Sequence, residues 1–89
     1  MLQQAITITN SKGLHARVAT KLVKTATQYQ ANITIVFDGK TADCKSVMSI
    51  LLLAASCNSE IVLQADGDDE QAAIDEIALL FANKFEEEH

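Results

Sequence analysis

The sequence predicts an α+β fold, an open-faced β-sandwich in which a four-stranded antiparallel sheet carries three helices packed on one face. Two patterns predict this class. Four short segments alternate apolar and polar residues, as strands with one buried face do. Between and after them lie segments whose apolar residues recur with a helical period. The elements follow the order β-α-β-β-α-β-α. Strands with one polar, solvent-exposed face are typical of an antiparallel sheet that is covered by helices on the other face.

The first strand is predicted over Ala5–Thr9, where Ile6 and Ile8 fall on one face. A loop over residues 10–13 follows the strand. From Ala16 the apolar residues take the spacing of a helix, and basic and amide side chains occupy the opposite face. The predicted buried stripe of this helix consists of Ala19, Leu22, Val23 and Ala26.

The middle of the chain predicts a hairpin and a short helix. Asn32–Phe37 alternates as a strand, and the dipeptide Asp38-Gly39 is a strong signal for a two-residue hairpin turn. We therefore expect Lys40–Asp43 to pair back on the preceding strand. Ser46 is a suitable N-cap for an apolar helix over Val47–Ala55.

The last third of the chain predicts one strand and one helix. Glu60–Ala65 alternates again, and Gly67 ends the strand. Asp68 and Gln71 have the spacing of a capping box at a helix start. The final helix is the best-defined element, because its apolar stripe continues over several turns. This stripe consists of Ile74, Ile77, Ala78, Phe81 and Phe85.

Length and charge limit what the protein can be. The chain has 89 residues with no proline, repeat or linker, so we expect residues 1–89 to form a single domain. The formal net charge is −5, divided unevenly: residues 1–59 carry six basic and two acidic side chains, and residues 60–89 carry one basic and ten acidic. Three of those acids form a tail, Glu86–Glu88, that is expected to fray. A net acidic chain argues against nucleic acid as the main ligand.

Nothing in the sequence predicts membrane insertion or secretion. The longest apolar run, Ile50–Ala55, is far shorter than a membrane span. The first residues, Met1–Gln4, lack the basic region of a signal peptide. We therefore expect a cytoplasmic location, where Cys44 and Cys57 would be reduced thiols.

No metal or cofactor is predicted. The two cysteines lack a metal-ligand spacing, and the chain has only two histidines, one of them the terminal His89, native or part of a tag. The acids from Asp66 to Glu70 suggest a calcium loop, but Gly67 is misplaced for an EF-hand and no closing glutamate follows. A solvated turn followed by acids at a helix N-terminus is the better interpretation.

The segment Gly13–Arg17 is the one stretch that suggests a chemical site. His15 lies where a loop meets the first helix, and the first helical N–H groups lack intrahelical partners and bind anions. A neutral imidazole is a usable nucleophile near neutral pH. His15 could accept a phosphoryl group, whose oxygens the N–H groups of Ala16 and Val18 and the Arg17 guanidinium would hold. The alternative is a surface histidine near a helix cap.

Four segments give the chain a resemblance to a known family. Ile6–Ile8, Gly13–Arg17, Lys45–Met48 and Ala65–Glu70 resemble the HPr family of histidine-containing phosphocarrier proteins, which includes nitrogen-branch members called NPr. The resemblance extends over the whole chain. The family belongs to the bacterial phosphoenolpyruvate-dependent phosphotransferase system.

The resemblance implies roles for individual residues. His15 corresponds to the histidine phosphorylated on Nδ1, and Arg17 to the residue that contacts the phosphoryl group. Ser46 corresponds to a serine that a regulatory kinase modifies in some bacteria, although a plain helix cap is the alternative we favour. Partner proteins would dock on a patch on the first two helices, some of whose apolar members could equally belong to the core. The patch comprises Thr20, Lys21, Lys24, Val47, Met48 and Leu51.

The resemblance also implies a function. His15 would take a phosphoryl group from phospho-enzyme I and pass it to enzyme II components, chiefly their IIA units, in sugar uptake or in the nitrogen branch. Such a carrier is a stoichiometric intermediate rather than an enzyme, and is expected to be a monomer. The alternative is a regulatory module whose binding to partners is switched by phosphorylation.

One position departs from the family pattern. The family usually has proline directly after the arginine, whereas this chain has Val18. Proline lacks an N–H group and presets the first helical turn. Valine restores one N–H, which we expect to face the phosphate or water and to change the rate of transfer or the preference for partners.

Overall fold

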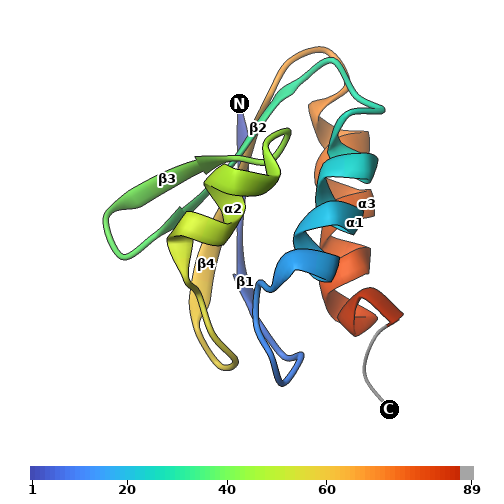
Figure 1. Cartoon of the computed structure of the whole chain (residues 1–89). Coiled ribbons are helices and arrows are strands. Elements are labelled where there is room, and N and C mark those ends of the chain that lie inside the picture. The colour runs from blue at the N-terminus through green and yellow to red at the C-terminus, as the bar shows by residue number, and fades with distance from the viewer. Residues whose placement is uncertain (87–89) are drawn as a thin grey trace.

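The computed structural model describes residues 1–86 and forms a sheet with helices on one face (Figure 1). Of the predicted tail Glu86–Glu88, only Glu86 is among the described residues; the rest of the tail and His89 lie outside them. The predicted order of strands and helices is confirmed, with one short 3-10 turn added at the end. The elements are β1 (Leu2–Thr7), α1 (Ala16–Ala26), β2 (Asn32–Phe37), β3 (Lys40–Asp43), α2 (Val47–Leu53), β4 (Glu60–Asp66), α3 (Glu70–Ala82) and η1 (Lys84–Glu86).

The four strands form one antiparallel sheet in the order β1-β4-β2-β3. The helices α3 and α1 lie side by side, and α2 lies over the β3 side of the sheet (Figure 1). Alternate residues of β2 and β4 point into the core between the layers. These are Ile33, Ile35, Ile61, Leu63 and Ala65. The face opposite to the helices carries polar side chains such as Gln64, whose amide donates to Gln3 Oε1 over 3.0 Å.

The observed first strand begins earlier than the sequence predicts. β1 starts at Leu2 because its first residues pair with β4, in the register Leu2↔Ala65. Gln3 and Gln4 show no apolar alternation, so only the long-range pairing reveals them as strand. The strand assignment stops at Thr7, although Ile8 still donates its N–H to the Ser59 carbonyl over 2.9 Å.

The predicted hairpin is confirmed. Asp38 and Gly39 both have positive φ, 52° and 76°, as the favoured two-residue hairpin turn requires. The predicted N-cap is also confirmed, since the Ser46 hydroxyl accepts a hydrogen bond from the Ser49 N–H over 3.3 Å. The helix α2 ends at Leu53, before the predicted Ala55, because Ala54 adopts a left-handed conformation with φ 55°.

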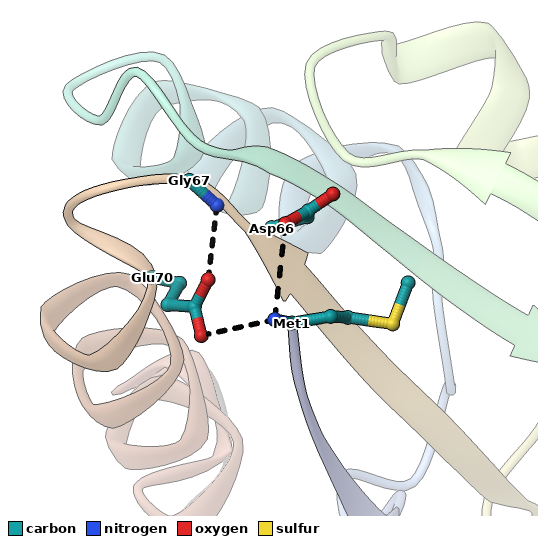
Figure 2. A network of polar contacts seen from close by, with 4 residues as sticks. All are labelled: Met1, Asp66, Gly67 and Glu70. Carbon is teal, nitrogen blue, oxygen red and sulfur yellow. Dashed lines mark hydrogen bonds and ion pairs between the residues drawn. The ribbon is translucent and has the colours of Figure 1, made fainter.

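The predicted capping box at Asp68 and Gln71 is wrong. Instead, Glu70 Oε1 accepts a hydrogen bond from the Gly67 N–H over 3.0 Å, and this bond is the main reason why the pKa of Glu70 is lowered. The other oxygen of Glu70 lies 3.3 Å from the Met1 ammonium, which also approaches Asp66 at 3.8 Å (Figure 2). The start of β1 is thus held against the turn between β4 and α3.

Asp69 connects this turn to the segment after α1. Its two carboxylate oxygens accept hydrogen bonds from the backbone N–H groups of Gln30 over 2.8 Å and Ala31 over 2.9 Å. These bonds, that of Gln30 foremost, hold the pKa of Asp69 below its usual range. A carboxylate at the start of α3 therefore fixes the chain as it enters β2.

Within residues 1–86, no helix is both long enough and apolar enough to cross a membrane.

Asp69→Asn is expected to lower the melting temperature at neutral pH. The pKa of Asp69 is lower in the folded protein than in the unfolded chain, so its contribution to stability is complete above about pH 4. This contribution is lost as the pH falls through the folded-state pKa. The difference in melting temperature between variant and wild type should therefore narrow as the pH falls through the lowered folded-state pKa of Asp69.

Thermal unfolding followed by circular dichroism between about pH 2 and 7 measures this difference. Asp68→Asn is the matched control, since it removes one exposed acid from the same turn. Equal melting temperatures for Asp69→Asn and Asp68→Asn at neutral pH would contradict a role for the Asp69 bonds.

Candidate functional site

His15 is the N-cap residue of α1. Its backbone is extended, with φ −91° and ψ 177°, and its side chain is half-buried. Within the described residues the imidazole makes no capping hydrogen bond to the helix. The ring thus lies at the start of the helix but does not cap it by a side-chain hydrogen bond, which leaves its nitrogen atoms available for chemistry.

The first turn of α1 presents backbone donors beside this ring. The first hydrogen bond of the helix runs from the Ala19 N–H to the His15 carbonyl over 2.9 Å. The N–H groups of Ala16 and Val18 therefore have no acceptor within the helix, and the helix dipole adds partial positive charge there. Val18 as a whole residue is fully buried, whereas Arg17 is exposed.

Contacts of the preceding loop hold His15 in place. Gly13 donates its N–H to the Asn10 carbonyl over 3.1 Å, and Leu14 donates its N–H to the Ala55 carbonyl over 3.0 Å. Gly13 has φ +63°, and a Cβ atom there would lie 2.5 Å from the Ala55 oxygen. Only glycine fits such an approach, so the loop rests directly on the segment after α2.

The three docking candidates on α1 differ in their surroundings. Thr20 and Lys24 are exposed, and Thr20 Oγ1 donates to the Ala16 carbonyl over 2.9 Å. Lys21 is half-buried, and its Nζ donates to the Phe85 carbonyl over 2.8 Å. Lys21 therefore ties the end of the described chain to α1, a structural role that the sequence did not predict.

The candidates on α2 form an apolar surface. Val47 and Leu51 are half-buried and pack against the core, whereas Met48 is 64% exposed. Leu52, which the sequence analysis did not single out, is 69% exposed. The run of three leucines was the available signal, because a seven-residue helix cannot bury all of them on one face.

His15 and Ser46 do not belong to one site. The bond between Leu14 and Ala55 places the His15 loop near the C-terminal end of α2. Ser46 lies at the opposite end of that helix, where the neighbouring Lys45 donates from Nζ to the Tyr29 carbonyl over 2.8 Å. That carbonyl belongs to the segment after α1, so the two candidate modification sites occupy opposite ends of the helix pair.

Neither cysteine suggests chemistry. Burial, aided by the nearby Asp43 carboxylate, raises the pKa of Cys44 to about 12, so its thiol stays protonated. Cys57 is half-buried in the loop before β4. Within residues 1–86, no group of three or more His, Cys, Asp or Glu side chains is arranged to hold a metal ion.

The role of Asn10 is evident only from the structure. Its side chain is only 2% exposed, and its Nδ2 donates to the Gly13 carbonyl over 2.6 Å. A polar residue three positions before the loop glycine was the only signal, and it resembles ordinary turn composition.

Comparisons with known proteins agree on one family. A family model described as the PTS HPr component phosphorylation site matches residues 2–83. The phosphocarrier protein HPr of Xylella fastidiosa strain Temecula1 is 42% identical over 88 residues, which is 99% of each chain. The phosphocarrier protein NPr of Shewanella violacea is 43% identical over 86 residues, 97% of this chain and 94% of its own.

Solved structures agree with the sequence comparisons. The crystal structure of HPr-C-His from Thermoanaerobacter tengcongensis has a TM-score of 0.95 at 39% identity, with all of both chains covered. A crystal structure of an HPr dimer from the same organism has a TM-score of 0.77 at 39% identity, covering 96% of this chain and 98% of that one. The predicted fold class is confirmed.

Gly13→Ala is expected to destabilise the protein more than Gly39→Ala. Both glycines have positive φ, so each alanine costs about 1–2 kcal/mol in backbone conformation. At Gly39 no atom lies within 4 Å of the new Cβ, whereas at Gly13 it would overlap the Ala55 carbonyl. We therefore expect a further loss of about 1–3 kcal/mol for Gly13→Ala alone.

The difference in free energy of unfolding between the two variants, from urea denaturation, isolates this overlap. Equal losses would show that the loop can move away from the segment after α2 at no cost, which would contradict the fixed position of His15.

Proposed function

The chain belongs to the HPr family of phosphocarrier proteins of the phosphotransferase system, and on this basis we propose that His15 carries the phosphoryl group. The observation that supports the proposal most directly is the position of His15: it is the N-cap residue of α1, and its ring makes no capping hydrogen bond. A relative named HPr and one named NPr are about equally similar to the chain, so the branch of the system stays open.

The proposed step is an exchange between two nitrogen atoms. The lone pair of neutral His15 Nδ1 forms a bond to phosphorus, and the bond from phosphorus to the nitrogen of the donor phosphohistidine breaks. The electron pair of the broken bond returns to the donor ring, so no oxidant or further reactant is needed. The reverse exchange then delivers the phosphoryl group to the acceptor.

The start of α1 would hold the phosphoryl oxygens during this exchange. The N–H groups of Ala16 and Val18 lack intrahelical acceptors and carry the positive end of the helix dipole. The Arg17 guanidinium on the same turn would add a positive charge. Donors fixed before the reaction need no reorganisation as charge shifts, which favours the transition state.

The partners would dock beside this site. Basic side chains on α1, with Lys24 exposed, and the exposed apolar side chains of Met48 and Leu52 on α2 suit partners with acidic-rimmed apolar surfaces. Enzyme I is the proposed donor and enzyme IIA components are the proposed acceptors. The carrier would act in the cytoplasm as a single-domain monomer and a stoichiometric intermediate rather than an enzyme.

A regulatory binding role is the second candidate. The exposure of Met48 and Leu52 favours it, because apolar side chains that large on one short helix suit protein contacts. Ser46 would be the point of control by a kinase, at the end of α2 far from His15. Partners that bind only one phosphorylation state of the protein, and do not take the phosphoryl group from it, would favour this role over phosphotransfer.

His15→Ala is expected to abolish phosphorylation. Incubation of the wild type with enzyme I and phosphoenolpyruvate should add one phosphate that is stable in base and released in acid, as a phosphohistidine is. Intact-protein mass spectrometry before and after acid treatment measures it. Ser46→Ala is the matched control and should accept phosphate normally; absence of label on the wild type would defeat the proposal.

Val18→Pro is expected to slow phosphoryl transfer by about tenfold. Proline removes the Val18 N–H, and the loss of one charge-assisted hydrogen bond of ~1.5 kcal/mol corresponds to that factor. Val18→Ala keeps the N–H and removes only buried side-chain atoms. It therefore separates the effect of losing the N–H group from the effect of losing the buried side chain. Unchanged transfer rates with every partner in Val18→Pro would show that this N–H does not contact the phosphate.

A further inference from the structure

The side chain of Asn10 is buried beside the proposed phosphorylation site. It is 2% exposed, and a buried amide needs a hydrogen-bond partner to offset the water it loses. Its partner is the Gly13 carbonyl, which accepts from Asn10 Nδ2 over 2.6 Å. Asn10 is therefore fixed by a short hydrogen bond inside the loop that leads to His15.

The same carbonyl is bound to His15. The Gly13 oxygen also accepts the His15 backbone N–H over 3.1 Å, so the Asn10 amide and the His15 backbone converge on one oxygen atom. The Asn10 carbonyl in turn accepts the Gly13 N–H over 3.1 Å. Asn10 thus holds both polar groups of Gly13, and the Gly13 carbonyl holds the backbone of the N-cap residue.

The loop has no room to compensate for a lost bond. On its other side Gly13 touches the segment after α2, where a Cβ would overlap the Ala55 oxygen, and Leu14 is bonded to that oxygen. A rotation of the Gly13–Leu14 peptide away from its present direction would therefore move the His15 backbone with it. The ring would then be displaced relative to the free N–H groups of α1.

We propose that Asn10 is a positioning residue for phosphoryl transfer, which sets the direction of the Gly13 carbonyl and through it the place of His15. This inference rests on the proposed function. Asn10 touches neither the phosphoryl group nor the ring; it acts through the Gly13 carbonyl. Its effect is geometric, because the ring and the N–H groups of α1 must contact the same phosphoryl group at the same time.

The test compares Asn10→Asp with Asn10→Ala. Aspartate has the shape of asparagine, but as a carboxylate it cannot donate to the Gly13 carbonyl, and alanine has no polar group. Single-turnover transfer from phospho-enzyme I should slow by roughly tenfold to hundredfold in both variants. The apparent KM for the donor should stay within about twofold of wild type, because the docking side chains on α1 and α2 are untouched.

A purely structural role would not produce this pattern. Ile35→Val, in the core strand β2, is the control, since it removes buried carbon at a distance from the loop and should leave the transfer rate unchanged. A folded Asn10→Asp or Asn10→Ala that transfers within about twofold of wild type would overturn the inference. So would the absence of folded protein for both variants, which would make Asn10 a folding residue only.

The wild type separates this inference from the proposed function. Absence of phosphate on wild-type His15 defeats the proposed function, and the positioning role falls with it. Normal labelling of wild type together with equal rates in the Asn10 variants defeats the positioning role alone.

Discussion

The close approach of two backbones, at Gly13 and Ala55, is the constraint on which the site depends. Gly13 has room for no side chain there, and the next residue, Leu14, donates its N–H to the Ala55 carbonyl. This contact joins the loop after β1 to the end of α2, so the first helix must start at a fixed point on the second. His15, as N-cap residue, inherits that fixed position.

Much of the fold could be predicted from local signals, because those signals act through the backbone of a few neighbouring residues. The hairpin at Asp38-Gly39 needs positive φ at two positions, and the Ser46 cap needs one hydroxyl at a helix start. The start of α1 at Ala16 follows from a change of period. Such features depend little on what the rest of the chain does.

The parts that could not be predicted depend on partners far along the chain. Leu2 belongs to β1 because it pairs with Ala65, and Asp69 binds the N–H groups of residues 30 and 31 rather than capping its own helix. Lys21, which the family resemblance implies as a docking residue, also donates to the distant Phe85 carbonyl. For the site, the sequence indicated His15, whereas the supporting side chain of Asn10 became evident only once its burial was known. Several acids of the last third, among them Asp66, Asp69, Glu70, Asp75 and Glu76, make internal contacts, so the net charge of −5 says little about partners.

In the proposed mechanism, His15 and the N–H groups of Ala16 and Val18 act on one phosphoryl group. Nuclear magnetic resonance of the phosphorylated protein tests it most directly, by observing coupling between phosphorus and the ring nitrogen atoms together with the amide signals of Ala16 and Val18. We expect phosphorus bound to Nδ1 of His15, with both amide protons moved downfield. Phosphorus on another residue, or unchanged amide signals at a phosphorylated His15, would contradict it.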